Sequence, residues 1–383
     1  MKKLLSEVCT IQYGFPFDSA KFSDSNGMPL IRIRDVVRGY SETYTTEEYK
    51  SEYIVHENDL LIGMDGEFNI AKWGKTPALL NQRVCRLAPK DSIDKDYLFY
   101  FMPIALKRIE EKTPFVTVKH LSAKELNKIE IPVLSLEEQR KIAETLSKVD
   151  KLIAFRDQQL AKLDELVKAR FVEMFGEPVS NPYKFEVRSL QNMLDDGIIT
   201  YHLDGNHGSD YPRNEEFVES GVSYISANCI IDDTVNLNLA KHLTEERAAK
   251  LRKGIAQDED VLFAHNATVG PVAILHTRET KVILGTSLTA YRCNKQRILP
   301  AYLKAYMQSE GFVRQYTKDM KQTTRNQVPI TAQRKYLFIV PPLSLQNQFA
   351  AFVERVDQQK QTVQQSLEKL ELMKKALMQE YFG

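Results

Sequence analysis

Hydrophobic residues recur at helical spacing in two long stretches of this 383-residue chain. In the second stretch Val356, Val363 and Leu370 follow one another at intervals of seven residues. Apolar residues at alternating steps of three and four are typical of a coiled-coil seam. The predicted seam consists of Leu146, Val149, Ile153, Leu160, Leu163, Val353, Val356, Val363, Leu367 and Leu370. The spacing therefore predicts two long helices, over residues 136–176 and 343–383.

The two predicted helices are copies of one another. Residues 139–176 align with residues 346–383 at an offset of 207 without a gap, and thirteen positions are identical, including Gln139/Gln346 and Phe175/Phe382. Because such a register is improbable by chance, we infer an internal duplication, whose period is far too long for a solenoid. Two ordinary amphipathic core helices would also fit the pattern. The more economical interpretation is that the copies pack on each other as a strut, roughly 57 Å long at about 1.5 Å per residue.

Sequence signals also mark the ends of these helices. Ser135 and Glu138 have the spacing of a capping box at the first helix start, and Gly176 and Gly383 follow the last helical residues. Lys360 and Lys374 interrupt the second seam. The facing helix must therefore offer these two lysines a specific partner.

The segments between the helices predict a mixed α/β fold. Residues 30–34, 59–63, 83–87 and 128–132 resemble strands, and residues 97–109 form an amphipathic helical pattern. The same order returns later: residues 221–226 answer 27–32, residues 258–263 answer 57–62, and residues 326–330 answer 117–121. We therefore expect two α/β domains, residues 1–135 and 177–342, each followed by a long helix.

Composition narrows the class of protein only slightly. Hydrophobic residues make up 43% and charged residues 27% of the chain, and no apolar run approaches the length of a membrane span. The four cysteines are scattered and the N-terminus lacks a signal-peptide core, so we expect a cytoplasmic protein. A formal net charge of +1 permits a DNA-binding protein with local phosphate contacts, but does not by itself indicate one.

The sequence contains no specific catalytic motif. Asn181-Pro182-Tyr183 resembles part of an adenine methyltransferase loop, but it lacks the second proline and a preceding glycine-rich turn, so we interpret it as a turn. No GxxxxGK[ST] motif is present. Asp65 and Glu67 could be nuclease carboxylates, although a loop is the better interpretation.

One cluster contains residue types that bind metals. It comprises His202, Asp204, His207 and Asp210. The cluster includes glycines and lacks the HExxH spacing of helical zinc sites. We therefore predict no metal and no catalytic residue in this chain.

The helix openings and endings resemble those of a known family. Pro132, Leu136, Glu138, Gln139 and Ile142 open the first helix, and Phe-Gly closes both helices. Repeated after each of two variable domains, this pattern resembles the specificity subunit of type I restriction–modification systems over essentially the whole chain. Residues 14–19, 63–69, 204–208 and 211–213 resemble segments of the target recognition domains of that family.

This resemblance implies a function for each part of the chain. Each variable domain would read one half of a bipartite double-stranded DNA target. The two helices would form an antiparallel coiled-coil spacer that carries two methyltransferase subunits, and restriction/motor subunits would complete a complex for DNA methylation and phage defence. The chain itself would be non-catalytic and hold no cofactor, with S-adenosylmethionine, ATP and Mg²⁺ on the partner subunits. A coiled-coil adaptor that binds protein partners is the competing hypothesis.

Side-chain chemistry predicts which residues contact DNA, since Arg, Lys, Asn and Gln read base edges and contact phosphates. In the first domain they are Arg32, Arg34, Lys72, Trp73, Lys75, Gln82, Arg83, Lys119 and His120. In the second domain they are Tyr201, His202, His207, Tyr211, Arg213, Asn228, His265, Asn266, Lys318, Lys321, Arg325, Asn326 and Gln327. Arg32 and Arg34 could instead form the solvated face of a strand, and Trp73 could belong to the core.

Overall fold

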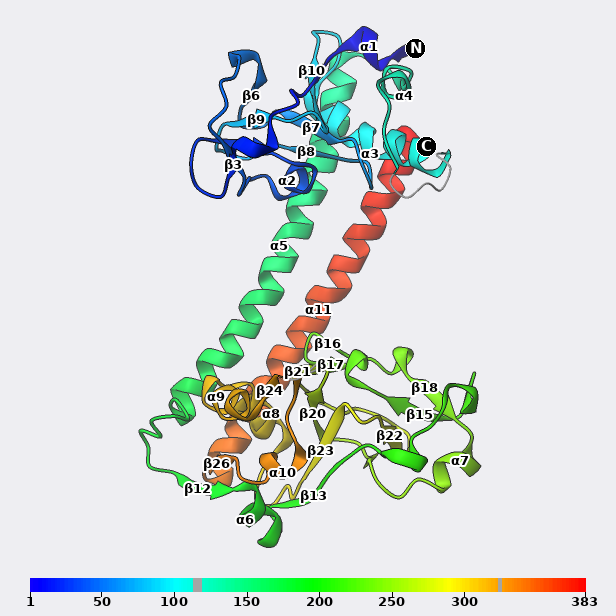
Figure 1. The fold of residues 1–383 in the computed structure, drawn as a ribbon. Coiled ribbons are helices and arrows are strands. Elements are labelled where there is room, and N and C mark those ends of the chain that lie inside the picture. The colour runs from blue at the N-terminus through cyan, green and yellow to red at the C-terminus, as the bar shows by residue number, and fades with distance from the viewer. Residues whose placement is uncertain (113–118, 323–325) are drawn as a thin grey trace. The chain divides into compact units, whose positions relative to one another are not determined.

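The chain is divided into two compact units that each contain parts of both long helices. The computed structural model describes residues 1–112, 119–322 and 326–383. Unit 1 comprises Met1–Asp157 and Gln365–Gly383, and unit 2 comprises Gln158–Gln364. The α/β class is confirmed, and Figure 1 labels many of the elements along the chain. Each long helix therefore contributes one segment to each unit.

The described residues of unit 1 form three small sheets and, besides the long helices, four shorter helices. A four-stranded antiparallel sheet has the order β2 (Cys9–Tyr13), β10 (Val84–Pro89), β7 (Leu60–Gly63), β8 (Asn69–Lys72). A five-stranded sheet has the order β3 (Phe22–Ser23), β5 (Tyr44–Thr45), β4 (Met28–Ile31), β9 (Ala78–Leu80), β6 (Ile54–Val55). Strand β1 (Lys2–Leu4) pairs with β11 (Glu130–Pro132). The helices are α1 (Leu5–Val8), α2 (Ile33–Arg38), α3 (Lys95–Lys112) and α4 (Ala123–Asn127).

Unit 2 repeats the strand order of unit 1 and, among the described residues, adds strands to the larger sheet. Its larger sheet has the order β13 (Ile199–Asp204), β23 (Leu288–Cys293), β20 (Val261–Asn266), β21 (Thr268–Ile274), β17 (Thr234–Val235), β16 (Ile230–Ile231). Beside β20 lies β25 (Asn326–Gln327), which also pairs with β24 (Lys321–Gln322). The second sheet has the order β14 (Phe217–Val218), β18 (Lys241–Leu243), β15 (Val222–Ile225), β22 (Val282–Leu284), β19 (Ile255–Ala256).

The remaining elements of unit 2 complete the correspondence. Strand β12 (Glu186–Ser189) pairs antiparallel with β26 (Leu337–Val340), as β1 pairs with β11. The short helices are α6 (Leu190–Asp195), α7 (Glu245–Ala249), α8 (Pro300–Gln308), α9 (Glu310–Asp319) and α10 (Ile330–Gln333). In both units one strand pair of the five-stranded sheet is parallel, β4 with β9 and β15 with β22. The duplication predicted from the helices therefore extends through the domains.

The duplication reaches single side chains. Gln139 is fully buried; its Oε1 accepts from the backbone N–H of Asp94 at 2.8 Å, and its Nε2 donates to the carbonyl of Leu134 at 2.9 Å. Gln346 makes the matching bonds, accepting from the N–H of Leu299 at 2.9 Å and donating to the carbonyl of Pro341 at 2.8 Å. Each glutamine thus satisfies backbone groups that would otherwise be buried without a partner.

Partly buried ion pairs are repeated as well. Arg86 contacts the carboxylate of Asp59 at 3.0 Å, and Arg292 contacts that of Asp260 at 2.8 Å. Asp59 and Asp260 also accept from the backbone N–H three residues earlier, at 3.0 and 2.8 Å. The ion pair joins the entry of one central strand (β7 or β20) to the next strand of the sheet (β10 or β23). These pairs fix equivalent strand registers in the two units.

Both long helices occupy the predicted segments. Helix α5 spans Leu136–Phe175 and helix α11 spans Leu343–Phe382. The Ser135 hydroxyl accepts from the N–H of Glu138 at 3.3 Å, and the carboxylate of Glu138 accepts from the N–H of Ser135 at 3.0 Å. The hydrogen bond from the Ser135 hydroxyl lowers the pKa of Glu138. After α5 the chain leaves the helix at Gly176, whose φ of 73° is the left-handed conformation that glycine favours.

Within each unit the segments of α5 and α11 run in opposite directions. In unit 1, Lys374 contacts Asp150 at 2.7 Å, and Nε of Arg156 donates to the Ser366 hydroxyl at 3.2 Å. In unit 2, Lys360 forms an ion pair with Asp164 of the facing helix. The two lysines that interrupt the predicted seam are therefore each neutralised by an aspartate across it.

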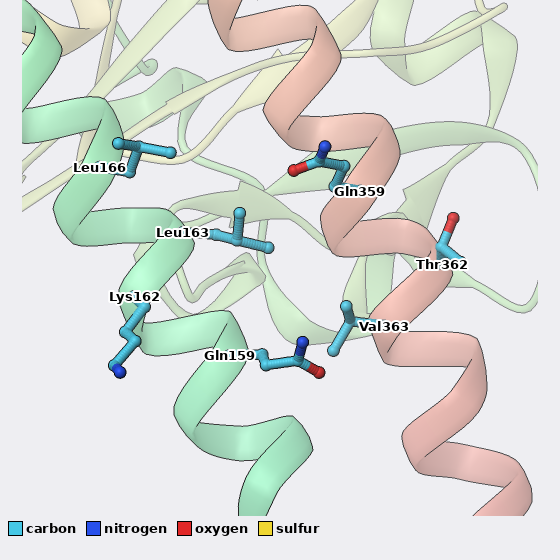
Figure 2. A pocket seen from close by; sticks show the side chains of 7 residues that line it. All are labelled: Gln159, Lys162, Leu163, Leu166, Gln359, Thr362 and Val363. Carbon is cyan, nitrogen blue, oxygen red and sulfur yellow. The ribbon is translucent and has the colours of Figure 1, made fainter.

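Burial along the seam is uneven. Leu146, Val149, Val356 and Leu367 are buried, whereas Ile153, Leu160, Leu163, Val353, Val363 and Leu370 are half-buried. A groove of about 620 Å³ lies between the helices in unit 2. Figure 2 shows Gln159 and Leu163 of α5 and Val363 of α11 pointing toward one another across this groove. The seam is thus open at this level and closed where it meets the cores of the units.

The first of the predicted strands is partly wrong. Strand β4 ends at Ile31, and residues 33–38 form helix α2, so Arg32 and Arg34 do not alternate on a strand face. The carboxylate of Asp35 accepts from the backbone N–H of Arg32 at 2.8 Å and starts the helix. Gly39, with φ 73°, ends the helix in the left-handed conformation. Local capping therefore overrode the alternating pattern of residues 30–34.

Candidate nucleic-acid interface

In unit 1 the hairpin of β7 and β8 projects a tip against which a later segment is bound. The N–H of Met64 donates to the carbonyl of Arg83 at 3.0 Å. The N–H of Gly66 donates to the carbonyl of Lys119 at 2.9 Å, and that of Leu121 to the carbonyl of Met64 at 2.7 Å. Three chain segments distant in sequence therefore meet at this tip, and Leu121 anchors the last of them in the core.

At the centre of the tip a carboxylate holds two basic side chains. Oδ2 of Asp65 lies 3.4 Å from Nε of Arg83, and Oδ1 lies 2.5 Å from Nδ1 of His120. The side chain of Asp65 is 19% exposed, whereas those of Arg83 and His120 are 54% and 52% exposed. Two of the predicted DNA-contacting residues are thus held at the surface by Asp65, which lies in the segment 63–69 and was predicted to be a loop residue rather than a nuclease ligand.

Unit 2 has the same construction at the hairpin of β20 and β21. The N–H of His265 donates to the carbonyl of Ser287 at 2.9 Å, that of Ala267 to Asn326 at 3.0 Å, and that of Val328 to His265 at 2.8 Å. Asn266 is paired directly with Gln327, as Asp65 is with His120. The predicted candidates Asn266, Asn326 and Gln327 are therefore brought together at this tip.

These hydrogen bonds correct the alignment of the two domains. Lys119 corresponds to Asn326 and Leu121 to Val328, an offset of 207 residues, which is also the offset of the helices. The sequence alignment, which matched residues 117–121 with 326–330, was two residues out of register. That alignment relied on the strand and the proline that follow each segment. The backbone hydrogen bonds at the tip give the true register.

Burial argues against two of the predicted DNA-contacting histidines of unit 2, which lie beneath the tip. His202 and His265 are both buried. Nε2 of His202 donates to Oε1 of Gln333 at 3.1 Å, and Nδ1 of His265 donates to the carbonyl of Val328 at 3.0 Å. Burial lowers the pKa of His202 to about 4 and also lowers that of His265. Both imidazoles are therefore neutral at physiological pH and support the tip from inside.

In unit 1, burial and internal pairing remove some candidates. Trp73 is 2% exposed and donates its indole N–H to the carbonyl of Thr76 at 2.7 Å, so it belongs to the core. Lys72 contacts Asp96 of α3 at 2.7 Å and lies over the ring of Phe99. These side chains serve packing within the unit in this conformation.

The other candidates of unit 1 differ in exposure. Arg32, Arg34, Lys75 and Gln82 are exposed. Lys119 is half-buried and donates to the carbonyl of Glu110 at 2.9 Å. Gln82 directly precedes Arg83, so it is the exposed candidate closest to the tip along the chain.

The remaining candidates of unit 2 are distributed over several surfaces. Exposed side chains are those of His207, Tyr211, Arg213, Asn228 and Lys318. Tyr201 is half-buried: its hydroxyl accepts from the N–H of Ile255 at 2.9 Å and its ring stacks under Arg292. The side chain of Lys321 and the whole of Arg325 lie outside the described residues, so these two remain predictions.

The residues behind the alternative chemistries make other contacts in the structure. His207 pairs with Asp204 at 2.7 Å, while His202 points to Gln333 in the interior. Within the described part of the chain, no group of three His, Cys, Asp or Glu side chains is arranged to hold a metal ion. Asn181 forms a turn, with its side chain bonded to both backbone groups of Phe185. Over residues 1–112, 119–322 and 326–383, no helix combines the length and apolarity needed to cross a bilayer.

Curated relatives of this chain are specificity subunits. It is 27% identical over 380 residues to the type I restriction enzyme EcoBI specificity subunit of Escherichia coli, covering 92% of this chain and 78% of the relative. It is 22% identical over 373 residues to the type I restriction enzyme MjaVIII specificity subunit of Methanocaldococcus jannaschii, covering 91% and 87%.

Solved structures share the fold. The S subunit of a type I restriction–modification system from M. genitalium superposes with a TM-score of 0.58 at 14% identity, over 100% of this chain and 96% of the other. The sequence model of the family described as "Type I restriction modification DNA specificity domain" matches residues 1–165 and 203–372, one region in each repeat. The chain therefore belongs to the type I restriction–modification DNA specificity family.

Proposed function

We propose that this chain is the DNA sequence-recognition subunit of a type I restriction–modification complex and has no catalytic activity of its own. Each unit reads one half of a bipartite double-stranded target. The observation that carries this proposal is the pair of hairpin tips, built on identical backbone hydrogen bonds but carrying different side chains. A repeated scaffold with divergent exposed groups suits a protein that reads two different half-sites.

The duplicated arrangement also suits the geometry of DNA. Dimeric DNA-binding proteins place two equivalent readers on half-sites separated by a set number of base pairs. Here one chain supplies both readers, joined by helices α5 and α11. The net charge of +1 favours a grip on phosphates that is local or shared with partner subunits.

The helices supply surfaces for the methyltransferase subunits. On α5, Leu152 and Phe155 are exposed in unit 1 and Leu166 in unit 2. On α11, Leu372 and Met373 are exposed in unit 1. Covering these apolar side chains with a partner protein would remove them from water, which favours association. We place the two methyltransferase subunits there, with S-adenosylmethionine on them and ATP and Mg²⁺ on restriction/motor subunits.

A methyl-transfer assay with purified components tests this proposal. Transfer of a labelled methyl group from S-adenosylmethionine to DNA is measured for the chain alone, the cognate methyltransferase subunit alone, and the two together. We expect transfer only from the complex, and only on DNA that contains the target. Methyl transfer by the chain alone would contradict a non-catalytic role. A stable complex whose methylation is independent of sequence would favour a protein-binding adaptor.

A further inference from the structure

The two hairpin tips offer a direct comparison of side chains at equivalent backbone positions. The pairing places Asp65 opposite His120 in unit 1 and Asn266 opposite Gln327 in unit 2. The backbone carbonyls that anchor each tip belong to Arg83 and Ser287. The scaffold is thus constant while the groups change from charged in unit 1 to amide and hydroxyl in unit 2.

In unit 1 the tip presents an oriented guanidinium. Arg83 is held through its Nε by Asp65 at 3.4 Å, and the same carboxylate holds His120 on its other oxygen. Half of the arginine side chain remains accessible to solvent. An arginine fork matches O6 and N7 of guanine, and a carboxylate that fixes its direction reduces the entropy lost on binding.

In unit 2 the residue equivalent to Arg83 is Ser287, which has no guanidinium to offer to a guanine. The hydroxyl of Ser287 accepts from the N–H of Ala227 at 2.9 Å and so serves the scaffold. The exposed Gln327 and the half-buried Asn266 are adjacent across the strand pair. Side-chain amides are the groups that pair with N6 and N7 of adenine.

We propose that the tips are the base-reading sites, and that they have different base preferences. Arg83, positioned by Asp65, reads a guanine in the half-site of unit 1, and Gln327 with Asn266 reads an adenine in the half-site of unit 2. This inference rests on the proposed function and adds the residues and bases that determine specificity.

Methylation mapping of variants tests the inference in the whole complex. The chain is co-expressed with its methyltransferase subunit as the wild type, as Arg83→Ala and as the double variant Asn266→Ala/Gln327→Ala. We expect Arg83→Ala to accept other bases at one former guanine of one half-site, with the second half-site unchanged. The double variant should relax one adenine of the other half-site. Discrimination at each position should fall about tenfold to a hundredfold.

Matched controls separate recognition from a general loss of charge or amide groups. Arg38 is an exposed arginine of unit 1 paired with Glu42, and Gln296 is an exposed glutamine beyond the other end of β23. Arg38→Ala and Gln296→Ala should leave both half-sites unchanged. Some tip variants could methylate DNA too weakly for mapping. For these, the purified complex is tested for binding to duplexes that carry each of the four bases at the position mapped for the wild type.

The outcomes distinguish this inference from the proposed function. A wild-type complex without a bipartite motif would overturn the proposed function itself. A bipartite motif that stays unchanged in Arg83→Ala, or binding that still prefers guanine, would overturn the inference alone. A half-site pair in which neither half contains a G·C pair would do the same.

The positioning role of Asp65 has its own test. Asp65→Asn should weaken discrimination at the guanine in the wild-type background and have no further effect in the Arg83→Ala background, because the two residues act as one unit. A purely structural role for Asp65 would give the same additional loss in both backgrounds. In that case Arg83 would read without the help of the carboxylate.

Discussion

The ring of Phe382, the penultimate residue of the chain, packs edge-on against Tyr97, with 5.2 Å between the ring centroids. Phe175, at the equivalent position of the first repeat, packs edge-on against Tyr302 at 4.8 Å. Phe382 closes α11 in unit 1, and Phe175 closes α5 in unit 2. Each repeat therefore ends its helix in the core of the unit opened by the other repeat. This exchange explains why the Phe-Gly ending is present twice.

Replacing either phenylalanine should destabilise the unit in which it is buried. Phe382→Ala and Phe175→Ala each leave a cavity among aromatic rings, with an expected loss of about 3–5 kcal/mol in the free energy of unfolding. Phe155→Ala, on a side chain that is 53% exposed, is the control. Chemical denaturation measures the loss, and hydrogen exchange locates it. Exchange protection lost only in unit 2 for Phe382→Ala would contradict the exchanged arrangement.

The repeated glutamines offer a second test of the duplicated scaffold. Gln139→Ala removes partners from the backbone groups of Asp94 and Leu134, and an unsatisfied buried group costs about 1–3 kcal/mol. Gln365 belongs to the same repeat alignment but is exposed. We expect thermal denaturation to show a clear loss for Gln139→Ala and for Gln346→Ala, and none for Gln365→Ala. Equal losses of stability in all three variants would show that Gln139 and Gln346 do not stabilise the protein through these backbone hydrogen bonds.

The free energy of unfolding should decrease as the pH is lowered through a window set by the pKa of His202. Its pKa falls from an ordinary 6.5 to about 4 on folding, so the unfolded chain takes up the proton first as the pH decreases. Stability is therefore complete above pH 6.5, decreases between 6.5 and 4, and levels off below 4, with a loss of about 3 kcal/mol from this group. His265, whose pKa is also lowered, adds to the same slope.

Comparison with His202→Gln isolates this contribution. The amide can still bond to Gln333 but does not titrate. Urea denaturation of both proteins from pH 7 to pH 4 should give a flatter decline for the variant. Parallel curves would show that His202 does not carry the pH dependence.

Lengthening the helices should change the gap between half-sites and nothing else. Four residues inserted near Ala161 add about 6 Å of helix. A matched insertion near Thr362 keeps the opposite-running helices in register, because Asp164 pairs with Lys360. We expect the methylated motif to keep both half sequences and gain about two base pairs between them. Altered half sequences with an unchanged gap would contradict the modular account.

Much of the architecture could be predicted from repetition and end signals. The matched register of the two helices, the Ser135–Glu138 capping box and Gly176 predicted both helices and their ends, because these signals are local. A specific partner on the facing helix was expected for Lys360 and Lys374, but the sequence did not identify Asp164 and Asp150 as the partners. Arg32 was assigned to a strand because residues 30–34 alternate in polarity. Asp35 and Gly39, which start and end helix α2, indicate the helix instead.

What the sequence could not provide depends on contacts between distant segments. An alignment of repeats pairs Phe175 with Phe382, but it contains no information on which unit each ring enters. Chemistry alone selected His202 and His265 as surface readers, yet Gln333 and Val328 bind them in the interior. Asp65 gained its role only when the backbone pairing placed it between Arg83 and His120. The sequence did contain a signal for the tip, which is the 207-residue offset of the long helices. At that offset residues 119–121, which close the tip in unit 1, align with residues 326–328 in unit 2.

The most direct test of two-site recognition is a genome-wide map of methylated bases in cells that express this chain with its cognate methyltransferase subunit. The account predicts one new motif, composed of two different half sequences separated by a gap of constant length. A motif with a single uninterrupted sequence, or no new methylation although the complex forms, would contradict the claim that two units of one chain read two half-sites.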